Sequence, residues 1–471
     1  MGAAEMSVAS ARRTLLLVNP VNSVRTGLTV NRSSRFPPIG LGIVAALTPS
    51  RWRVELADEN WQPFVYRHAD LVGITAFTAS APRAYEIAAL YRARSVPVVM
   101  GGIHASVCPD EALRFVDAVV IGEAEPTWPQ VLADVESGRL QKIYRGGWPD
   151  LAGLPQPRRD LFHPDYLFAS VQTSRGCPMD CEFCSVTAFN GRRYRRRPTD
   201  EVLDELSTIR QRMLFFVDDN IIGYGPRSRD EALALFQGMV RRGLDKQWFC
   251  QASINFADDD EILHWAARAG CKMVFLGLEA EEADALAVVN KRLNLRRGVE
   301  SYSSAFQRIH RAGIAVLGAF IFGMDGDTPE KLHRRTDYMI QSRVDVMEVT
   351  CLTPLPGTCL FRRLHDEGRL LYTDFPRDWE RYDMTEVVHR PSDMAPAALA
   401  RAMDAANRRI YAWPVLLCKA LRTLRGTRNP TAMLFAWGSN LNYRAVAAGH
   451  RIADHAPRRQ RRNWPSTRSG A

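Results

Sequence analysis

Short apolar runs alternate with longer amphipathic stretches along the first part of the chain. Five runs of strand length end in turn residues, at 14–19, 52–58, 70–76, 96–100 and 117–121. Segments with helical character lie between them, at 37–47, 83–94 and 109–115. Regular exchange of strand and helix is typical of a parallel sheet covered by helices. We therefore predict a doubly wound α/β domain whose ligand crevice lies outside the carboxyl ends of its strands.

The same alternation resumes near Phe168 and repeats about six times. Predicted strands lie at 168–176, 213–217, 248–254, 272–278, 314–322 and 346–352. Predicted helices lie at 199–206, 258–269, 297–312 and 329–342. Six repeats are too few for a closed barrel of eight. The sequence thus predicts a second α/β domain that is distinct from the first.

Composition changes mark the predicted boundaries. Proline and glycine concentrate in a linker at 146–161, which separates domains at 14–145 and 162–360. Beyond residue 361 the alternation stops, and we predict a mostly helical region to 455 and a disordered basic tail at 456–471. The segment 413–425 interleaves apolar and basic residues. Such a helix can pack on its own protein or lie on a membrane surface.

Charge and cysteine content narrow the classes of function. The net charge is +10, and arginines cluster at 192–197 and 458–462. A basic surface can bind nucleic acid, membranes or anionic ligands, but no nucleic-acid module is recognisable, so no nucleic-acid partner is predicted. Without an apolar run long enough for a membrane span or a signal-peptide core, the chain is predicted to be cytoplasmic, where free thiols persist.

Candidate chemistry concentrates in one loop, Cys177-Pro-Met-Asp-Cys181-Glu-Phe-Cys184. A 4Fe–4S cluster is normally held by four thiolates. No fourth cysteine lies nearby, so three thiolates would leave one iron open to another ligand. Structural zinc would prefer a fourth Cys or His close by, and buried free thiols are the other alternative. The spacing therefore favours a cluster.

The CxxxCxxC spacing, with an aromatic residue before its last cysteine, resembles the signature of radical S-adenosylmethionine (SAM) enzymes. In that family the open iron binds the amino and carboxylate groups of SAM, and one electron cleaves SAM to a 5′-deoxyadenosyl radical. The resemblance implies that residues 162–360 form an open six-fold (β/α) barrel with SAM at the strand ends. It places SAM contacts at Phe183, Asp218, Asp219, Ser253, Glu279 and Ile321.

Single residues of this set have plainer explanations. The acidic residues could be helix caps or solvated strand ends. Lys291 and Arg292 could bind a phosphate or a carboxylate, although a surface pair is the simpler interpretation. The stretch 353–358, Thr-Pro-Leu-Pro-Gly-Thr, is similar to one found near the barrel mouth in the family, and its prolines preset a turn.

Glycine and polar residues follow the strands of the first domain. The order GGxH at 101–104, PDEAL at 109–113 and GExE at 122–125 resembles the cobalamin-binding domain that precedes many radical SAM cores. No GxGxxG fingerprint indicates a dinucleotide instead. A degenerate flavodoxin-like domain used only for packing is the alternative. The resemblance implies cobalamin contacts at Thr75, Gly101, Gly102, His104, Gly122 and Glu123.

One departure from the cobalamin pattern is informative. The motif DxHxxG, whose histidine binds cobalt in some cobalamin proteins, is absent. We therefore predict that the lower face of cobalt is open or hydrated. His104 could contact the corrin, or it could simply order the Gly-Gly turn.

Taken together, the resemblances imply a cobalamin-dependent radical SAM enzyme. The most direct activity is C-methylation of an unactivated carbon in a small-molecule or lipid-like substrate, with a flavodoxin or ferredoxin as electron donor. The C-terminal region loosely resembles that of the hopanoid methylase-type branch, and a peripheral membrane contact is left open. Oxidative cyclisation or ring contraction with the same cofactors is one alternative, and a non-catalytic iron–sulfur electron carrier is another. No catalytic side chain is singled out.

Overall fold

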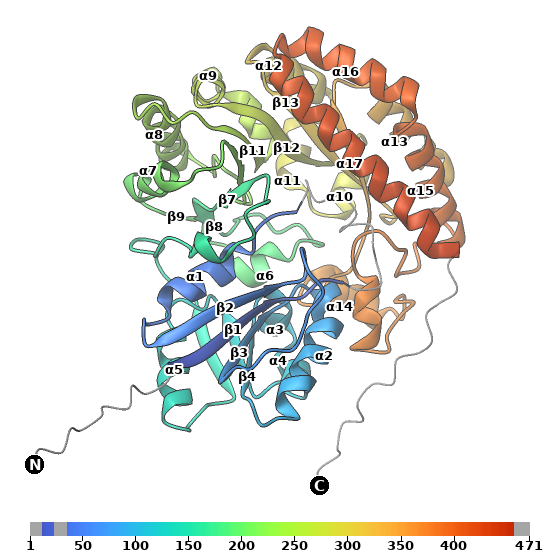
Figure 1. Ribbon diagram of the computed structural model, residues 1–471. Helices are drawn as coiled ribbons and strands as arrows, with labels where there is room; N and C mark the ends of the chain where they lie inside the picture. The colour runs from blue at the N-terminus through green and yellow to red at the C-terminus, as the bar shows by residue number, and fades with distance from the viewer. Residues whose placement is uncertain (1–11, 23–34, 456–471) are drawn as a thin grey trace, which may run out of the picture.

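The computed structural model describes residues 12–22 and 35–455, and it contains two six-stranded parallel sheets joined by a short connection (Figure 1). The N-terminal sheet has the order β2-β1-β3-β4-β5-β6. Its strands are β1 (Arg13–Asn19), β2 (Trp52–Asp58), β3 (Leu71–Thr75), β4 (Val98–Gly101), β5 (Ala118–Gly122) and β6 (Ile143–Gly147). Its helices are α1 (Ile39–Leu47), α2 (Ala81–Arg92), α3 (Ile103–Val107), α4 (Pro109–Ala112) and α5 (Trp128–Glu136).

Alternate residues of β1 face opposite sides of this sheet. Leu16 and Val18 are buried in one core, and Leu15 and Leu17 are buried in the other. Both faces are therefore covered, as a buried parallel sheet requires. The predicted doubly wound domain is confirmed.

Strand β6 was not predicted, and it overlaps the start of the predicted linker. An added Cβ at Gly146 would lie 1.6 Å from the carbonyl oxygen of Glu123, so only glycine fits where β6 approaches β5. Glycine content is a turn signal in most sequences. Here the glycine serves close backbone approach within a sheet.

The second sheet has the order β14-β13-β12-β11-β10-β7, with all neighbouring strands parallel. Its strands are β7 (Ala169–Val171), β10 (Met213–Phe216), β11 (Gln247–Ala252), β12 (Cys271–Glu279), β13 (Ala315–Phe322) and β14 (Val346–Cys351). Because β7 and β14 do not pair with each other, the sheet is an open six-stranded barrel, as predicted. A separate antiparallel pair joins β8 (Ser174–Arg175) to β9 (Arg195–Arg196).

Most helices of this domain follow its strands and cover the barrel. They are α7 (Thr199–Thr208), α8 (Pro226–Arg241), α9 (Asp260–Arg268), α10 (Ala283–Val288), α11 (Arg292–Arg297), α12 (Tyr302–Arg311) and α13 (Pro329–Gln341). Two more, α6 (Val186–Asn190) and α14 (Cys359–Asp366), lie on the side of the N-terminal domain (Figure 1).

Three helices complete the C-terminal region, α15 (Pro396–Ile410), α16 (Trp413–Thr427) and α17 (Pro430–His455). Helix α17 packs Ala432 and Ala436 against Met273 and Leu317 of the barrel. No helix in the described part of the chain is both long and apolar enough to span a membrane. The predicted tail at 456–471 lies outside the described residues.

Aromatic side chains from distant segments meet inside the barrel. Phe36, which precedes α1, has its ring centroid 4.8 Å from that of Phe215 on β10. Phe215 stacks on Phe249 of β11 at 4.3 Å, and Phe168 packs edge-on against Phe435 of α17. The N-terminal segment and the last helix therefore both contribute to the interior of the second domain.

Candidate active site

The CxxxCxxC loop connects β8 to α6, and several segments hold it. The backbone N–H of Cys177 donates to the Gly191 carbonyl, and that of Glu182 donates to the Val289 carbonyl, both at 3.2 Å. The Leu360 N–H donates in turn to the Glu182 carbonyl at 3.0 Å. The loop is thus fixed by the segments after α6, α10 and β14.

Gly176 begins this loop in a conformation that glycine favours. Its φ is +90°, and an added Cβ would lie 2.2 Å from the carbonyl oxygen of Arg193. A larger residue would push apart the strands that carry the loop.

The three thiols lie among groups suited to a metal cluster and its ligand. Cys177 Sγ is 3.4 Å from the hydroxyl of Tyr224, which lies 3.0 Å from Ser253 Oγ. Burial raises the pKa of Cys184 to about 12 and also raises that of Cys181. Such buried thiols become thiolates when they bind iron. Three thiols in one anchored loop fit the open-sited cluster predicted from their spacing.

Glu279 and Lys291 form a buried ion pair beside the cysteines, with Nζ and Oε1 2.6 Å apart. Burial opposes the charge of Lys291, but Glu279 and the neighbouring thiols raise its pKa overall. The expectation that Lys291 belongs to a surface pair is therefore wrong, because the turn after α10 directs it inward. Arg292 is the exposed member, near Asp180.

Glu279 has a positive φ of +64° at the carboxyl end of β12, where the register with β13 shifts. An added Cβ at Gly277 would lie 2.6 Å from Glu279 Oε1 and 2.9 Å from Lys291 Nζ. The glycine therefore leaves room for the ion pair inside the barrel mouth. A strained non-glycine residue held this way is typical of functional sites.

The two neighbouring aspartates at the end of β10 differ in their roles. Asp218 is fully buried and accepts bonds from the backbone N–H and hydroxyl of Thr173 and from the hydroxyl of Ser174. These bonds fix the turn that leads to the cysteine loop. Asp219 is partly exposed, and burial together with Asp218 raises its pKa to about 6. Asp219 is the better placed of the two to meet a ligand.

Apolar residues pack against the aromatic side chain of the cysteine loop. Phe183 packs against a cluster that includes Ile321, Met324 and Leu360. Apolar surroundings exclude water from a radical site and strengthen its electrostatic interactions. The structure thus brings five of the six predicted SAM residues to the barrel mouth as partly exposed groups or members of this apolar cluster, and it gives Asp218 a supporting position.

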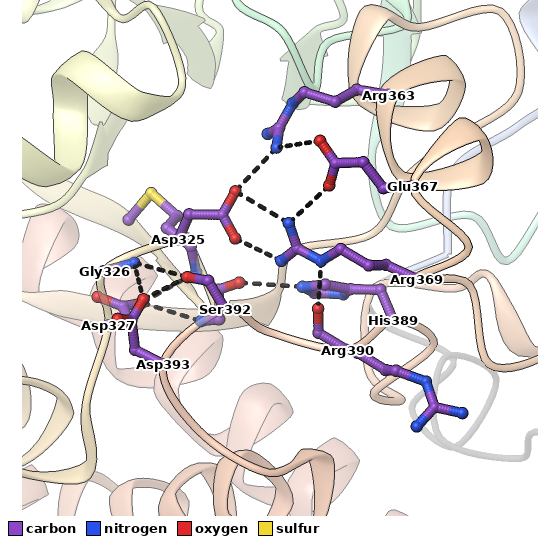
Figure 2. Close-up of polar contacts among 12 residues, drawn as sticks. Asp325, Gly326, Asp327, Arg363, Glu367, Arg369, His389, Arg390, Ser392 and Asp393 are labelled. Carbon is purple, nitrogen blue, oxygen red and sulfur yellow. Dashed lines mark hydrogen bonds and ion pairs between the residues drawn. The ribbon is translucent and has the colours of Figure 1, made fainter.

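The loop after β13 is tied to the C-terminal region by charged groups (Figure 2). Arg363 donates to Asp325 at 2.8 Å and to Glu182 of the cysteine loop at 3.3 Å. Burial alone would raise the pKa of Asp325, but Arg369 and Arg363 lower it to about 2. His389 also reaches this loop, with Nε2 3.0 Å from the Gly323 carbonyl oxygen.

The predicted cobalamin edge is lined by backbone rather than by bulky side chains. Gly102 has a φ of +90°, and an added Cβ would lie 2.6 Å from Thr75 Oγ1 and 3.2 Å from the Ala76 backbone. The N–H of Gly122 donates to Ser106 Oγ at 2.9 Å. Thr75, Gly101, Gly102 and Gly122 all retain partial exposure. The glycines let neighbouring strand ends approach each other closely, which a Cβ would prevent, and the resulting edge without bulky side chains fits a broad flat ligand such as a corrin.

His104 lies behind this edge and has no exposed surface. Its Nε2 is 3.1 Å from both the Tyr85 hydroxyl and Glu111 Oε1, and its Nδ1 is 3.4 Å from Thr78 Oγ1. Glu111 also accepts a bond from Trp379 Nε1 at 3.0 Å. These contacts favour a role for His104 in ordering the Gly-Gly turn, and they do not favour a contact with the corrin.

Glu123 links the two domains instead of lining the open edge. Arg175 donates to Glu123 at 2.7 Å and to Glu125 at 2.7 Å. Arg195 donates to the same Glu123 carboxylate at 3.0 Å. All of these side chains have at most about one-eighth of their surface exposed. This buried group, Glu123, Glu125, Arg175 and Arg195, is called the interdomain ion-pair cluster below.

Sequence reasoning missed this cluster because it interpreted the arginines of 192–197 as a charge excess. Arg195 and Arg197 in fact point inward, and Arg197 pairs with the buried Glu205. The signal that could have indicated this is the short strand β9 inside the run, where a strand directs alternate side chains to opposite faces. Tyr224 was also missed, although two glycines with positive φ, Gly223 and Gly225, flank it.

Comparisons with known proteins agree with this geometry. The Radical SAM superfamily profile matches residues 171–338, and the B12 binding domain profile matches residues 25–132. The fold and the site place this protein in one class, the B12-dependent enzymes of the radical SAM type. The chain belongs to the radical SAM superfamily and carries a B12-binding domain ahead of its radical SAM domain, so its cofactors are a 4Fe–4S cluster, SAM and cobalamin.

Individual relatives share most of this architecture. Bacteriochlorophyllide d C-12(1)-methyltransferase of Chlorobaculum tepidum is 28% identical over 85% of this chain and 88% of its own length. Hopanoid C-2 methylase of Rhodopseudomonas palustris is 31% identical over 72% of this chain and 66% of its own. The methyltransferase TsrM of Kitasatospora setae, solved with cobalamin and a [4Fe-4S] cluster, has a TM-score of 0.61 at 19% identity, covering 83% of this chain and 82% of its own.

We expect the loop cysteines alone to hold the cluster. Anaerobically reconstituted protein should contain about four irons, and the triple variant Cys177→Ala, Cys181→Ala, Cys184→Ala should fall below about one. Iron and sulfide analysis measures this. The matched control replaces Cys108, Cys359 and Cys418, which are also at least partly exposed, by Ala, and this variant should keep its iron. The thiols expected to be dispensable are Cys108, Cys250, Cys271, Cys351, Cys359 and Cys418. A cluster retained in the loop variant would contradict the assignment.

Gly102→Leu should abolish cobalamin binding while the iron content stays unchanged. The larger side chain would collide with Thr75 and the Ala76 backbone and distort the edge, whereas the cluster loop lies in the other domain. Absorbance of bound cobalamin per protein gives the readout. Gly438→Leu is the matched control, because it makes the same substitution at an exposed glycine of α17 where an added Cβ would meet nothing within 4 Å. Equal cobalamin binding by both variants would show that the cobalamin site lies elsewhere.

The enclosed position of His104 predicts that no protein nitrogen binds cobalt. The EPR spectrum of bound cob(II)alamin should show no superhyperfine splitting from the protein, and labelling the protein with ¹⁵N should leave it unchanged. A label-dependent splitting that disappears in His104→Gln would overturn this expectation.

Removing the central carboxylate of the interdomain ion-pair cluster should strongly lower the free energy of unfolding. Glu123→Ala leaves two buried arginines without their shared partner, which typically costs about 3 to 5 kcal/mol. Denaturant unfolding should show the loss. Glu231→Ala removes an exposed pair with Arg227 and should cost about 0.5 kcal/mol or less. Similar effects of the two variants would mean that the cluster does not hold the domains together.

Proposed function

We propose that this protein is a cobalamin-dependent radical SAM C-methyltransferase that acts on an unactivated carbon of a small-molecule or lipid-like substrate. One observation carries the proposal: the carboxyl ends of both sheets face the same interface. The glycine edge lies on one side, and the CxxxCxxC loop lies on the other. Glu123, directly after β5, contacts Arg175, which lies two residues before Cys177.

Further contacts support this arrangement of the two edges. An added Cβ at Gly357 would lie 2.8 Å from Val107 of α3 and 3.7 Å from Ala188 of α6. Helix α3 follows the glycine edge and α6 follows the cysteine loop, so the 353–358 turn packs between the two predicted cofactor sites. A substrate bound at this interface would be within reach of both.

The chain's own residues would position the reactants and shield them. Cys177, Cys181 and Cys184 would hold the cluster, and the strained Glu279 beside Lys291 would offer a carboxylate to SAM. The apolar cluster around Phe183 and Ile321 would exclude water. When bound, the cluster and SAM supply the radical and cobalamin supplies the transferable methyl group.

The relatives support methylation without fixing the substrate. Two of them are named for methyl transfer, one to a bacteriochlorophyllide and one to a hopanoid. We extend to this chain only what these substrates share, which is a largely apolar skeleton. A flavodoxin or ferredoxin as electron donor and a cytoplasmic location complete the proposal.

A labelling experiment tests methyl transfer directly. Given SAM with a deuterated methyl group, the enzyme with its substrate should form a product that carries a CD3 unit, together with 5′-deoxyadenosine. Mass spectrometry of candidate substrates from the source cells supplies the readout. The Cys177, Cys181, Cys184 triple alanine variant is the control and should form neither.

Two other outcomes separate the alternatives. Release of 5′-deoxyadenosine with an altered product that lacks the label would indicate cyclisation or ring contraction. No release of 5′-deoxyadenosine from reduced, cluster-loaded protein would indicate an electron carrier and would refute the proposal.

A further inference from the structure

We propose that one face of α16, continued by α17, binds the surface of a membrane that contains anionic lipids. The side chains of Trp413, Leu417 and Leu421 are 50%, 54% and 56% exposed, and Leu434 of α17 is 60% exposed. Residues four apart lie on one side of a helix, so Trp413, Leu417 and Leu421 form one outward stripe. These four residues with Arg422 and Arg425 are called the α16 face below.

Helix α16 carries apolar residues on its outward side as well as on its inward side. The inward side buries Leu416, and beside it Lys419 and Thr423. Lys419 Nζ donates to the carbonyls of Met339, Ser342 and Val344 at 2.7–2.9 Å. A helix that packed only on its own protein would turn all of its leucines inward. Here the buried lysine helps to fix the rotation of the helix, and Leu417 and Leu421 face outward.

The charge of the C-terminal region indicates what kind of partner the α16 face binds. No Asp or Glu occurs between Asp404 and Asp454. Residues 396–471 contain 14 Lys and Arg and two Asp, an excess of 12, whereas the whole chain has a net charge of only +10. The remainder of the protein is therefore slightly acidic, and part of this excess, Arg422, Arg425 and Arg428, lies on α16 or directly after it.

An anionic bilayer surface matches both features of this region. Apolar side chains of an interfacial helix enter the headgroup boundary, while arginines pair with lipid phosphates. The exposed Arg422 and Arg425 follow the apolar stripe on α16. A nucleic acid would use the charge but leave Trp413, Leu417 and Leu421 in water.

The position of the helices is compatible with this contact. In Figure 1, α16 lies at the end of the barrel far from the B12-binding domain, and α17 runs from that end along the barrel. Binding through the α16 face would therefore leave the interface between the two domains uncovered. The proposal does not depend on the reaction that the enzyme catalyses.

Vesicle co-sedimentation of the full chain tests the proposal. The protein should bind vesicles of phosphatidylcholine mixed with phosphatidylglycerol, and it should bind pure phosphatidylcholine much more weakly. High salt should reduce binding, because surface charges are screened. The variant Leu417→Ser, Leu421→Ser, Arg422→Glu, Arg425→Glu should bind the anionic vesicles at least about tenfold more weakly.

A matched variant controls for general changes in polarity and charge. Val65→Ser, Leu90→Ser, Arg227→Glu, Arg241→Glu changes exposed residues elsewhere in the protein, with the same change in charge and a similar loss of apolar surface. It should bind vesicles as the unmodified protein does. Both variants should keep their iron content, which shows that they are folded.

Three results would overturn the proposal. Absence of binding to anionic vesicles at low salt is one, and equal weakening by both variants is another. Binding of the α16 face to duplex DNA, or self-association through it, without any vesicle binding would assign the surface to a different partner.

Discussion

The carboxylate of Glu123, enclosed between two arginines, is the constraint on which the arrangement of this enzyme depends. It directly follows Gly122, the last residue of the glycine edge, and Arg175 lies two residues before Cys177 of the CxxxCxxC loop. Burying these charges is expensive unless every partner is present. The pair therefore tolerates little displacement, and it sets the spacing between the two cofactor sites within narrow limits.

The C-terminal region reinforces the same spacing from the other side. Trp379 donates to Glu111 beneath the glycine edge, and Arg363 joins the cysteine loop to the loop after β13. One segment of the chain thus touches both domains near their functional ends. Substrate differences among related enzymes can be accommodated around such a frame without moving the cofactors, because function resides in sites added to a shared fold.

The sequence was sufficient for what depends on local pattern. Apolar runs located nearly every strand, and the cysteine spacing singled out a loop that the structure holds by hydrogen bonds from three other segments. It was insufficient where a side chain's role depends on a distant partner. Lys291 looks like a surface residue until Glu279 is placed beside it. Arg195 looks like solvated charge, and β6 looks like a linker, because the groups that explain them lie on other strands.

The aromatic interior of the barrel bears on how the chain is made. Phe36 comes from the beginning of the chain and contacts the rings of Phe168, Phe215 and Phe249, whereas Phe435 comes from near the end of the described chain and contacts Phe168. During synthesis the N-terminal sheet emerges complete, while the barrel still lacks its last helix. The barrel can close its interior only after α17 has left the ribosome, so its strands, which end at Cys351, stay partly open while the C-terminal region is made.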